Sequence, residues 1–277
     1  MRSRPLRSCF ILWANLSLIF VSIAPYYRTA FVLLTPNHRK VYNLNMIKQM
    51  NDLTTINQEI HKIGREMVNC SQNCAGISLN QKDGILPRCL IFEARESTDL
   101  KNGCVIVGIN PGHCKADERE YYLEKGISYD SVLEYWRQRI SEREYYKALR
   151  KFGEELGLID SILWTELVKC ENKQGLRELP LQTFRTCTMK YLSQELNIVP
   201  ADWPFIAVGK GAYHALAYLY PERTLIGIPH PTGSYGHFKK LFDKEGRLLE
   251  QFKQAFSQMK ASSGGLAWFD GNKRKVI

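Results

Sequence analysis

The stretch Val105-Ile-Val-Gly-Ile-Asn-Pro-Gly112 is the strongest indication of the fold. It begins as an uninterrupted apolar run, which is typical of a strand buried on both faces of a parallel sheet. It ends in glycine, asparagine and proline, residues that favour a tight loop whose backbone can approach a ligand closely. The stretch therefore predicts a central strand followed directly by a binding loop.

Three further apolar runs follow, separated by segments whose apolar residues have helical spacing. Strands that alternate with helices favour a parallel sheet with helices on both faces. We therefore expect an α/β protein with three layers, α/β/α, around a central four-stranded, mostly parallel sheet. The expected strands cover residues 104–108, 162–168, 204–208 and 224–228, and the main helices cover residues 46–68, 181–196, 211–220 and 235–260.

A second loop, His230-Pro-Thr-Gly-Ser234, follows the last of these strands. Pro229 and Pro231 restrict the backbone on both sides of the histidine and thereby fix the direction of its imidazole. Because ligands bind outside the carboxyl ends of parallel strands, we expect both loops at one edge of the sheet. Two purely structural alternatives stay open: Asn110 would only cap the next helix, and His230 would be an ordinary structural histidine.

Together the two loops resemble those of the uracil-DNA glycosylase superfamily. Residues 108–112 match the motif of its mismatch-specific uracil/thymine branch, and His230-Pro-Thr is similar to its His-Pro-Ser loop, with Thr in place of Ser. Thr165-Glu-Leu-Val-Lys-Cys170 is similar to the Thr-Asn-Val-Val-Lys-Cys strand of the iron-sulfur branch. Cys187-Thr-Met-Lys-Tyr-Leu192 likewise resembles the Cys-x-x-x-Tyr-Leu helix of that branch. The resemblance covers residues 70–255.

The resemblance implies a base-excision repair enzyme that hydrolyses the N-glycosidic bond of a uracil or related damaged base flipped out of DNA. Asn110 would orient the attacking water, and His230 would stabilise the negative charge that develops on the leaving base. The aromatic residue on which the base stacks is not identified, and the candidates are Tyr121, Tyr122, Tyr129 and Tyr135. Further contacts to the base and the DNA would come from Gly108, Ile109, Pro111, Gly112, Glu166, Pro231, Thr232 and Ser234.

Glu166 departs from the iron-sulfur branch, which has at this place an Asn that recognises uracil through its N3–H and O4. An ionised carboxylate accepts from N3–H but has no donor for O4. Either the pocket prefers another base, or Glu166 is protonated, or its side chain points elsewhere. The departure also favours an alternative function, a catalytically inactive descendant that binds nucleic acid or a nucleotide.

The eight cysteines predict metal ligands or buried thiols, because a chain of this size without a clear secretion signal rarely has a disulfide framework. By the resemblance, four of them would hold a [4Fe-4S] cluster, although the first pair is Cys-x-x-x-Cys where that branch has Cys-x-x-Cys. The alternative is that all eight are free thiols, the preferred interpretation for Cys9, Cys89, Cys104 and Cys114. The four expected ligands are Cys70, Cys74, Cys170 and Cys187.

The first 45 residues differ from the rest, with six Lys/Arg, no Asp/Glu and an uncharged, largely apolar segment at residues 8–27. This extension resembles a signal sequence or a short membrane anchor, and an anchor would favour an unrelated function. The alternative is that it is sequence upstream of a start at Met46. We prefer a start at Met46, which gives a cytoplasmic protein. The expected parts are the extension of residues 1–45, a glycosylase-like domain of residues 46–260 and a flexible basic tail of residues 261–277.

The charge permits a nucleic-acid partner without requiring one. The net charge is +10, but beyond the extension 32 Lys/Arg stand against 28 Asp/Glu. Positive charge on the body of the protein is therefore modest, and binding to phosphates would depend on where it gathers. We expect DNA carrying a damaged or deaminated base as the partner, and a monomer with no obligate protein partner.

Overall fold

The computed structural model describes residues 52–94, 100–176, 178–232, 234, 236–242, 246–262, 264–270 and 275–276. The extension of residues 1–45, its apolar segment and Met46 lie outside these residues, so both interpretations of the extension stay predictions. In the part of the chain that is described, no helix is long and apolar enough to cross a membrane.

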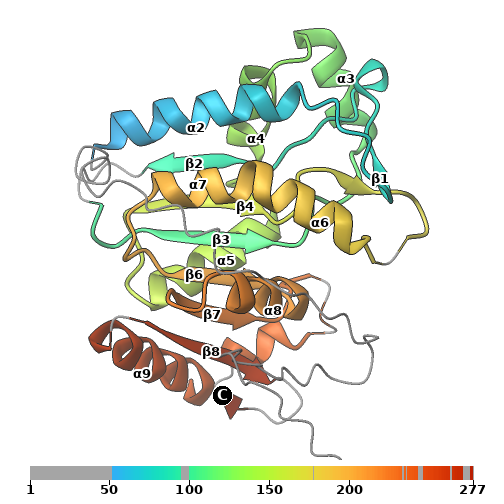
Figure 1. The fold of residues 1–277 in the computed structure, drawn as a ribbon. Helices are drawn as coiled ribbons and strands as arrows, with labels where there is room; N and C mark the ends of the chain where they lie inside the picture. The colour runs from blue at the N-terminus through green and yellow to red at the C-terminus, as the bar shows by residue number, and fades with distance from the viewer. Residues whose placement is uncertain are drawn as a thin grey trace, which may run out of the picture. The chain divides into compact units, whose positions relative to one another are not determined.

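A mixed seven-stranded sheet forms the centre of the folded part, in the order β2-β4-β3-β6-β7-β8-β9 (Figure 1). The four expected strands are β4, β3, β6 and β7, which are adjacent and parallel. The α/β class is confirmed, but the expected sheet of four strands was too small. The strands are β2 Ile91–Ala94, β3 Cys104–Gly108, β4 Ser161–Glu166, β6 Phe205–Val208, β7 Thr224–Ile228, β8 Gly265–Asp270 and β9 Lys275–Val276.

The additional strands lie at the two sides of this parallel centre. β2 pairs antiparallel with β4, β8 pairs parallel with β7, and β9 pairs antiparallel with β8. Residues 265–270, expected to belong to a flexible tail, therefore form a strand, with Phe269 fully buried and Leu266 47% exposed. The glycines and basic residues around this short strand make its composition look like that of a tail.

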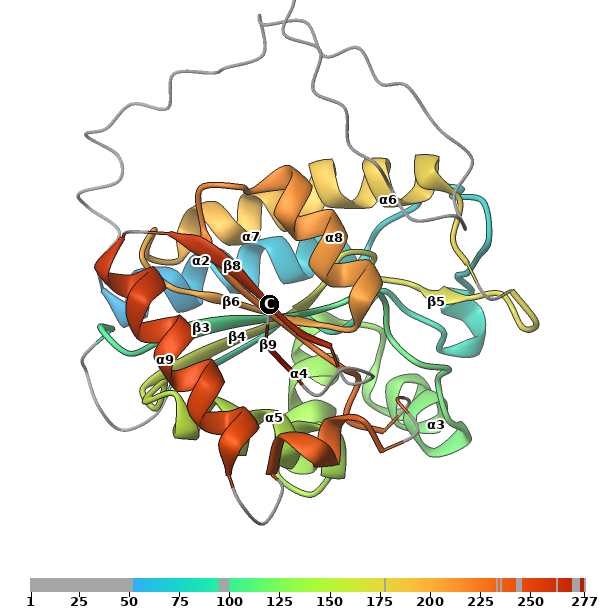
Figure 2. The ribbon, with the colours of Figure 1, turned by 90° about the horizontal axis from the view of Figure 1, so that it is seen from below.

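Helices cover both faces of the sheet: α2, α6, α7 and α8 lie on one face, and α4, α5 and α9 on the other (Figure 2). All five residues of β3 are buried, as the continuous apolar run predicts for a strand covered on both faces. The helices are α2 Leu53–Val68, α3 Ala116–Lys125, α4 Tyr129–Arg139, α5 Glu144–Glu155, α6 Leu181–Cys187, α7 Ser193–Ile198, α8 Lys210–Leu219 and α9 Arg247–Ala261. The shorter elements are β1 Ile77–Ser78, η2 Gln81–Asp83, β5 Glu171–Asn172, η3 Thr188–Leu192 and η4 Phe238–Phe242.

The single closing helix expected over residues 235–260 is divided. A 3₁₀ helix, η4, comes first, and α9 begins at Arg247 directly after Gly246, which has a left-handed backbone with φ of 65°. Glycine adopts this conformation at little cost, and a continuous helix cannot contain it. The loop after β7 is therefore followed by a short turn of helix and then by a separate helix packed on β7 and β8.

The order of the strands places a topological switch point at the carboxyl end of β3. The chain passes from β3 to β4 on one side and later returns to β6 on the other side of β3. Connections that leave in opposite directions create a crevice at the carboxyl ends of the strands, where ligands bind in open α/β sheets. The loop after β3 begins at this switch point, and β6 lies between β3 and β7 in the sheet.

Candidate functional site

The loop after β3 stays attached to the chain that continues from β4. The backbone oxygen of Gly108 accepts from the Leu167 amide at 3.0 Å, and that of Ile109 accepts from the Val168 amide at 2.9 Å. The Ile109 side chain also packs against Gly211 in the first turn of α8. These contacts hold the start of the loop rigidly at the sheet edge.

Asn110 belongs to the loop and not to the following helix. Its Nδ2 donates to the Pro111 oxygen at 3.1 Å, which fixes the carboxamide within its own turn. The next helix, α3, begins at Ala116, and Lys115 occupies its N-cap position. The alternative that Asn110 serves as a helix cap is therefore wrong.

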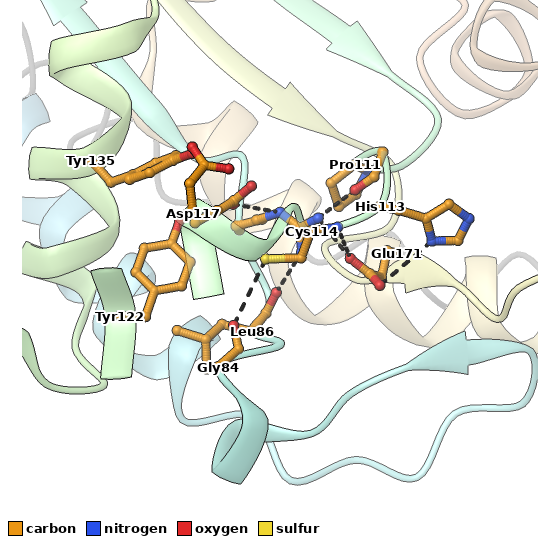
Figure 3. Close-up of polar contacts among 12 residues, drawn as sticks. Gly84, Leu86, Pro111, His113, Cys114, Asp117, Tyr122, Tyr135 and Glu171 are labelled. Atoms are coloured by element: carbon orange, nitrogen blue, oxygen red, sulfur yellow. Dashed lines mark hydrogen bonds and ion pairs between the residues drawn. The ribbon is translucent and has the colours of Figure 1, made fainter. Parts of the chain in front are cut away.

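A buried ion-pair network supports the far end of this loop (Figure 3). The guanidinium of Arg88, 1% exposed, contacts Glu118 at 3.1 Å and Glu171 at 2.7 Å, and also donates to the Gly112 oxygen. The same Glu171 carboxylate accepts from the Cys114 amide at 2.6 Å. The network thereby fixes the loop backbone on both sides of residue 113.

Sequence reasoning missed the residues of this network. Arg88 precedes β2, Glu118 is in α3, and Glu171 is in β5, so they are far apart in the chain. In the sequence these three residues look like ordinary charged residues beside apolar runs, which usually lie on the protein surface. Their burial follows from the tertiary structure alone.

In the loop after β7, His230 has a defined ring orientation. Its Nδ1 lies 3.3 Å from the Thr232 amide and 3.2 Å from the Thr232 hydroxyl. An Nδ1 that accepts from the amide leaves the proton of a neutral ring on Nε2. Burial among the surrounding atoms lowers the pKa of His230, although part of the side chain stays exposed, and this favours the neutral donor form.

The other expected residues of this loop differ in their exposure. Thr232 is exposed and Pro231 is half-buried. Ser234 accepts from the Phe238 amide at 3.2 Å and therefore caps η4. The hydroxyls of Ser234 and Thr232 thus both have partners within the protein, since that of Thr232 lies beside His230.

Glu166 lies at the last position of β4, directly beside Gly108 in the parallel register. Its carboxyl fills the space that a side chain at residue 108 would need, which explains the requirement for glycine there. One carboxyl oxygen is buried and has no hydrogen-bond partner among the described residues. Burial raises the pKa of Glu166 to about 8.

Tyr145, in the first turn of α5, lies near both His230 and Glu166. Its ring centroid lies 5.1 Å from that of His230, with an angle of 36° between the planes. Burial, together with the nearby Glu166 carboxyl, raises the pKa of this tyrosine. Sequence reasoning missed Tyr145, because nothing in its spacing distinguishes it from the adjacent Tyr146.

Three of the four tyrosines expected as stacking candidates are buried in the core, and the fourth, Tyr121, is half-buried. Tyr122, Tyr129 and Tyr135 are at most 1% exposed and belong to the core. Tyr121 packs against Tyr135, with ring centroids 5.4 Å apart. None of the three buried rings is accessible to a base, so Tyr145 replaces them as the candidate.

Four cysteines from distant segments converge on one small cavity of about 20 Å³. Cys70 and Cys74 follow α2, Cys170 directly precedes β5, and Cys187 ends α6. Burial raises the pKa of the Cys74, Cys170 and Cys187 thiols, and that of Cys187 reaches about 11. The cavity-lining thiols are those of the four expected ligands, Cys70, Cys74, Cys170 and Cys187. Among the described cysteines, Cys89, Cys104 and Cys114 do not line it, and Cys9 lies outside the described residues.

The arrangement of these thiols does not suit a single metal ion. Over the residues that the structure describes, no group of three potential ligands is close enough to hold one. A four-iron cluster has a different requirement, because each cysteine binds its own iron and the sulfurs stay farther apart. Two sulfurs also have donors nearby: the Lys169 amide lies 3.3 Å from Cys187, and the Lys190 ammonium lies 3.7 Å from Cys70.

No family model and no curated protein matches this chain. The carboxyl edge of the sheet holds a carboxamide that can orient a water, a neutral imidazole that can donate a proton or hydrogen bond, a buried carboxyl and an aromatic ring.

Proposed function

We propose that this protein is a DNA glycosylase that hydrolyses the N-glycosidic bond of a flipped-out uracil or related damaged base. The observation that carries the proposal is the position of Tyr145 beside both His230 and Glu166. An aromatic ring next to a neutral imidazole and a buried carboxyl suits a planar base, which needs stacking and hydrogen bonds at its edge.

The two loop residues have separate parts in this reaction. Asn110 positions the attacking water through its fixed carboxamide, since an amide cannot act as a general base. His230 donates from Nε2 to the oxygen of the leaving base, where negative charge develops in the transition state. The neutral ring favoured by its lowered pKa already has the proton for this hydrogen bond.

We also propose that the four cavity-lining cysteines hold a [4Fe-4S] cluster. The convergence of four thiols from separate segments, with donors to two sulfurs, fits such a group. The cavity is small, so the thiol side chains would rotate outward to admit it. The cluster would supply a covalent link among the end of α6, the segment after α2 and the segment before β5.

The test is cleavage of oligonucleotides that carry a single uracil, hypoxanthine, xanthine or mismatched thymine. The wild type should leave alkali-labile abasic sites. Asn110→Ala should lose about 100-fold in rate, and His230→Ala about 100- to 1,000-fold. The exposed residues Asn197 and His214 provide matched controls, and Asn197→Ala and His214→Ala should cleave like the wild type.

A second outcome would support a different function. Correctly folded wild-type protein that binds these oligonucleotides but leaves no abasic sites would contradict the glycosylase proposal. It would favour the inactive binding protein that the substitution of Glu for Asn at residue 166 suggests.

A further inference from the structure

Lys190 lines the cavity of the four cysteines as a half-buried cation. Its ammonium lies 3.7 Å from the Cys70 sulfur and 5.0 Å from the centre of the Tyr191 ring, and no acidic side chain of the described residues pairs with it. The other lysine of the cavity, Lys169, is fully buried and contacts the Glu195 carboxylate at 2.7 Å. Because a cation removed from water needs a compensating charge, Lys190 indicates a negative group at Cys70.

A second donor reaches the same sulfur. The Tyr191 side chain is 2% exposed, and its hydroxyl interacts with the Cys70 sulfur. This hydroxyl also lies 3.4 Å from the Glu66 backbone oxygen. Cys70 thus has two side-chain donors, whereas the described donor to Cys187 is the Lys169 backbone amide at 3.3 Å.

The helix that carries both donors is widened beside the cavity. Thr188–Leu192 form η3, a turn of π helix between α6 and α7. A π turn contains one residue more than an α turn and is frequently found at functional sites. Cys187, Lys190 and Tyr191 all line the cavity. One expected ligand and both donors therefore reach the cavity from this turn and the residue before it.

Donors at these sulfurs have an electrostatic consequence. Cysteines bind iron as thiolates, so each of the four expected ligands brings a negative charge into a largely buried place. Such charge is unfavourable away from water unless cations or hydrogen bonds compensate it. An electron taken up at the iron adds to the negative charge, and hydrogen bonds to the sulfurs are among the features that set the reduction potential. A donor at a sulfur therefore favours the reduced state.

We propose, resting on the [4Fe-4S] cluster proposed above, that Lys190 and Tyr191 compensate the negative charge at Cys70 and thereby raise the reduction potential of the cluster. Lys190 has the larger effect, because a hydrogen bond from a charged donor is roughly twice as strong as one from a neutral donor. Both are positioning residues that act through the Cys70 sulfur.

The experiment measures the reduction potential itself. Proteins purified without oxygen are analysed for iron and sulfide and then studied by protein-film voltammetry, in which the electrode supplies the electron. The variants are Lys190→Met, Lys190→Arg and Tyr191→Phe. The controls Lys62→Met and Tyr218→Phe remove the same groups from side chains that are 68% and 56% exposed and do not line the cavity.

Lys190→Met should lower the reduction potential, and Tyr191→Phe should lower it by roughly half as much. Lys190→Met should also lose iron to a chelator about 10-fold faster than the wild type, because it lacks a partner of the ligand sulfur. Lys190→Arg, which keeps the charge, should behave like the wild type. The two controls should do the same.

An unchanged potential in Lys190→Met that retains its iron would overturn this inference and leave the cluster standing. Iron lost by Lys190→Met but kept by Lys190→Arg would support the inference, because the cluster then needs the charge, whereas loss from both variants would overturn it. Wild-type protein without iron would overturn the inference together with the cluster. Cleavage of the oligonucleotides decides the glycosylase function separately in every case.

Discussion

At the scale of single residues, the pairing of Gly108 with Glu166 explains two features of the site. A side chain at residue 108 would collide with the carboxyl, and the absence of one lets the acid lie across the end of β3. Burial raises the pKa of this carboxyl to about 8, and one of its oxygens, Oε2, is inaccessible to solvent. Glycine at residue 108 thus leaves room for the Glu166 side chain of the neighbouring strand, β4, and also suits the turn that follows β3.

This raised pKa predicts that Glu166 makes stability depend on pH. The unfolded carboxyl ionises near its ordinary pKa of 4.5 and the folded one near 8, so the wild type loses stability as pH rises through this window. Glu166→Gln should gain on the order of 1–2 kcal/mol relative to the wild type between about pH 5 and about pH 9. Urea unfolding at several pH values measures this, with Glu142→Gln as control. A constant difference between Glu166→Gln and the wild type would contradict it.

At the scale of elements, β8 extends the sheet beyond the strands that the pattern of the chain predicts. Its residues alternate in burial, with Ala267 and Phe269 inside and Leu266 outside. Phe269 contacts Phe252 of α9, with ring centroids 6.1 Å apart. The strand therefore helps to fix α9 against the sheet.

Phe269→Ala should destabilise the protein by about 3–5 kcal/mol, because it leaves a cavity between β8 and α9. Leu266→Ala in the same strand should cost less than about 0.5 kcal/mol, since that side chain is 47% exposed. The free energy of unfolding in urea separates the two variants. Equal small losses would mean that residues 265–270 do not pack as a strand of the sheet.

The Arg88 network joins β5, α3 and the loop after β3. Arg88→Met should cost about 3–5 kcal/mol, because it leaves the buried carboxylates of Glu118 and Glu171 without their cation. The exposed Arg65→Met in α2 is the control and should change stability by less than about 0.5 kcal/mol. Thermal unfolding of both variants measures the difference, and a stable Arg88→Met would show that the network is dispensable for the fold.

At the scale of the whole molecule, the cysteine cavity joins segments that are far apart in the chain, since Cys74 and Cys170 are separated by 96 positions. Cys70 and Cys74 follow α2, whereas Cys170 and Cys187 come after β4 and before β6. Glu171, directly after Cys170, contacts Arg88, and Lys169, directly before it, contacts the backbone oxygen of Glu166. The segment 169–171 therefore connects the cavity with the site. Loss of Cys170 should therefore affect both the cysteine cavity and the site.

Protein purified without oxygen should contain four irons and four sulfides per chain if the cluster is present, as its composition requires. Cys170→Ala should lose the iron and the visible absorption, whereas Cys104→Ala, whose thiol is buried away from the cavity, should retain both. Iron and sulfide analysis of the three proteins decides the question. Wild-type protein without iron would refute the cluster and favour free thiols.

Local sequence determined the α/β class, the four parallel strands at the centre and the two loops, because continuous apolar runs and Gly/Pro loops are short-range signals. Such signals do not report on distant partners. Tertiary structure alone placed Tyr145 beside His230, buried Arg88 among its acids, added β8 and excluded three tyrosines from the site. It also raises the pKa of Glu166, because the pKa of a carboxyl depends on the groups that fold around it.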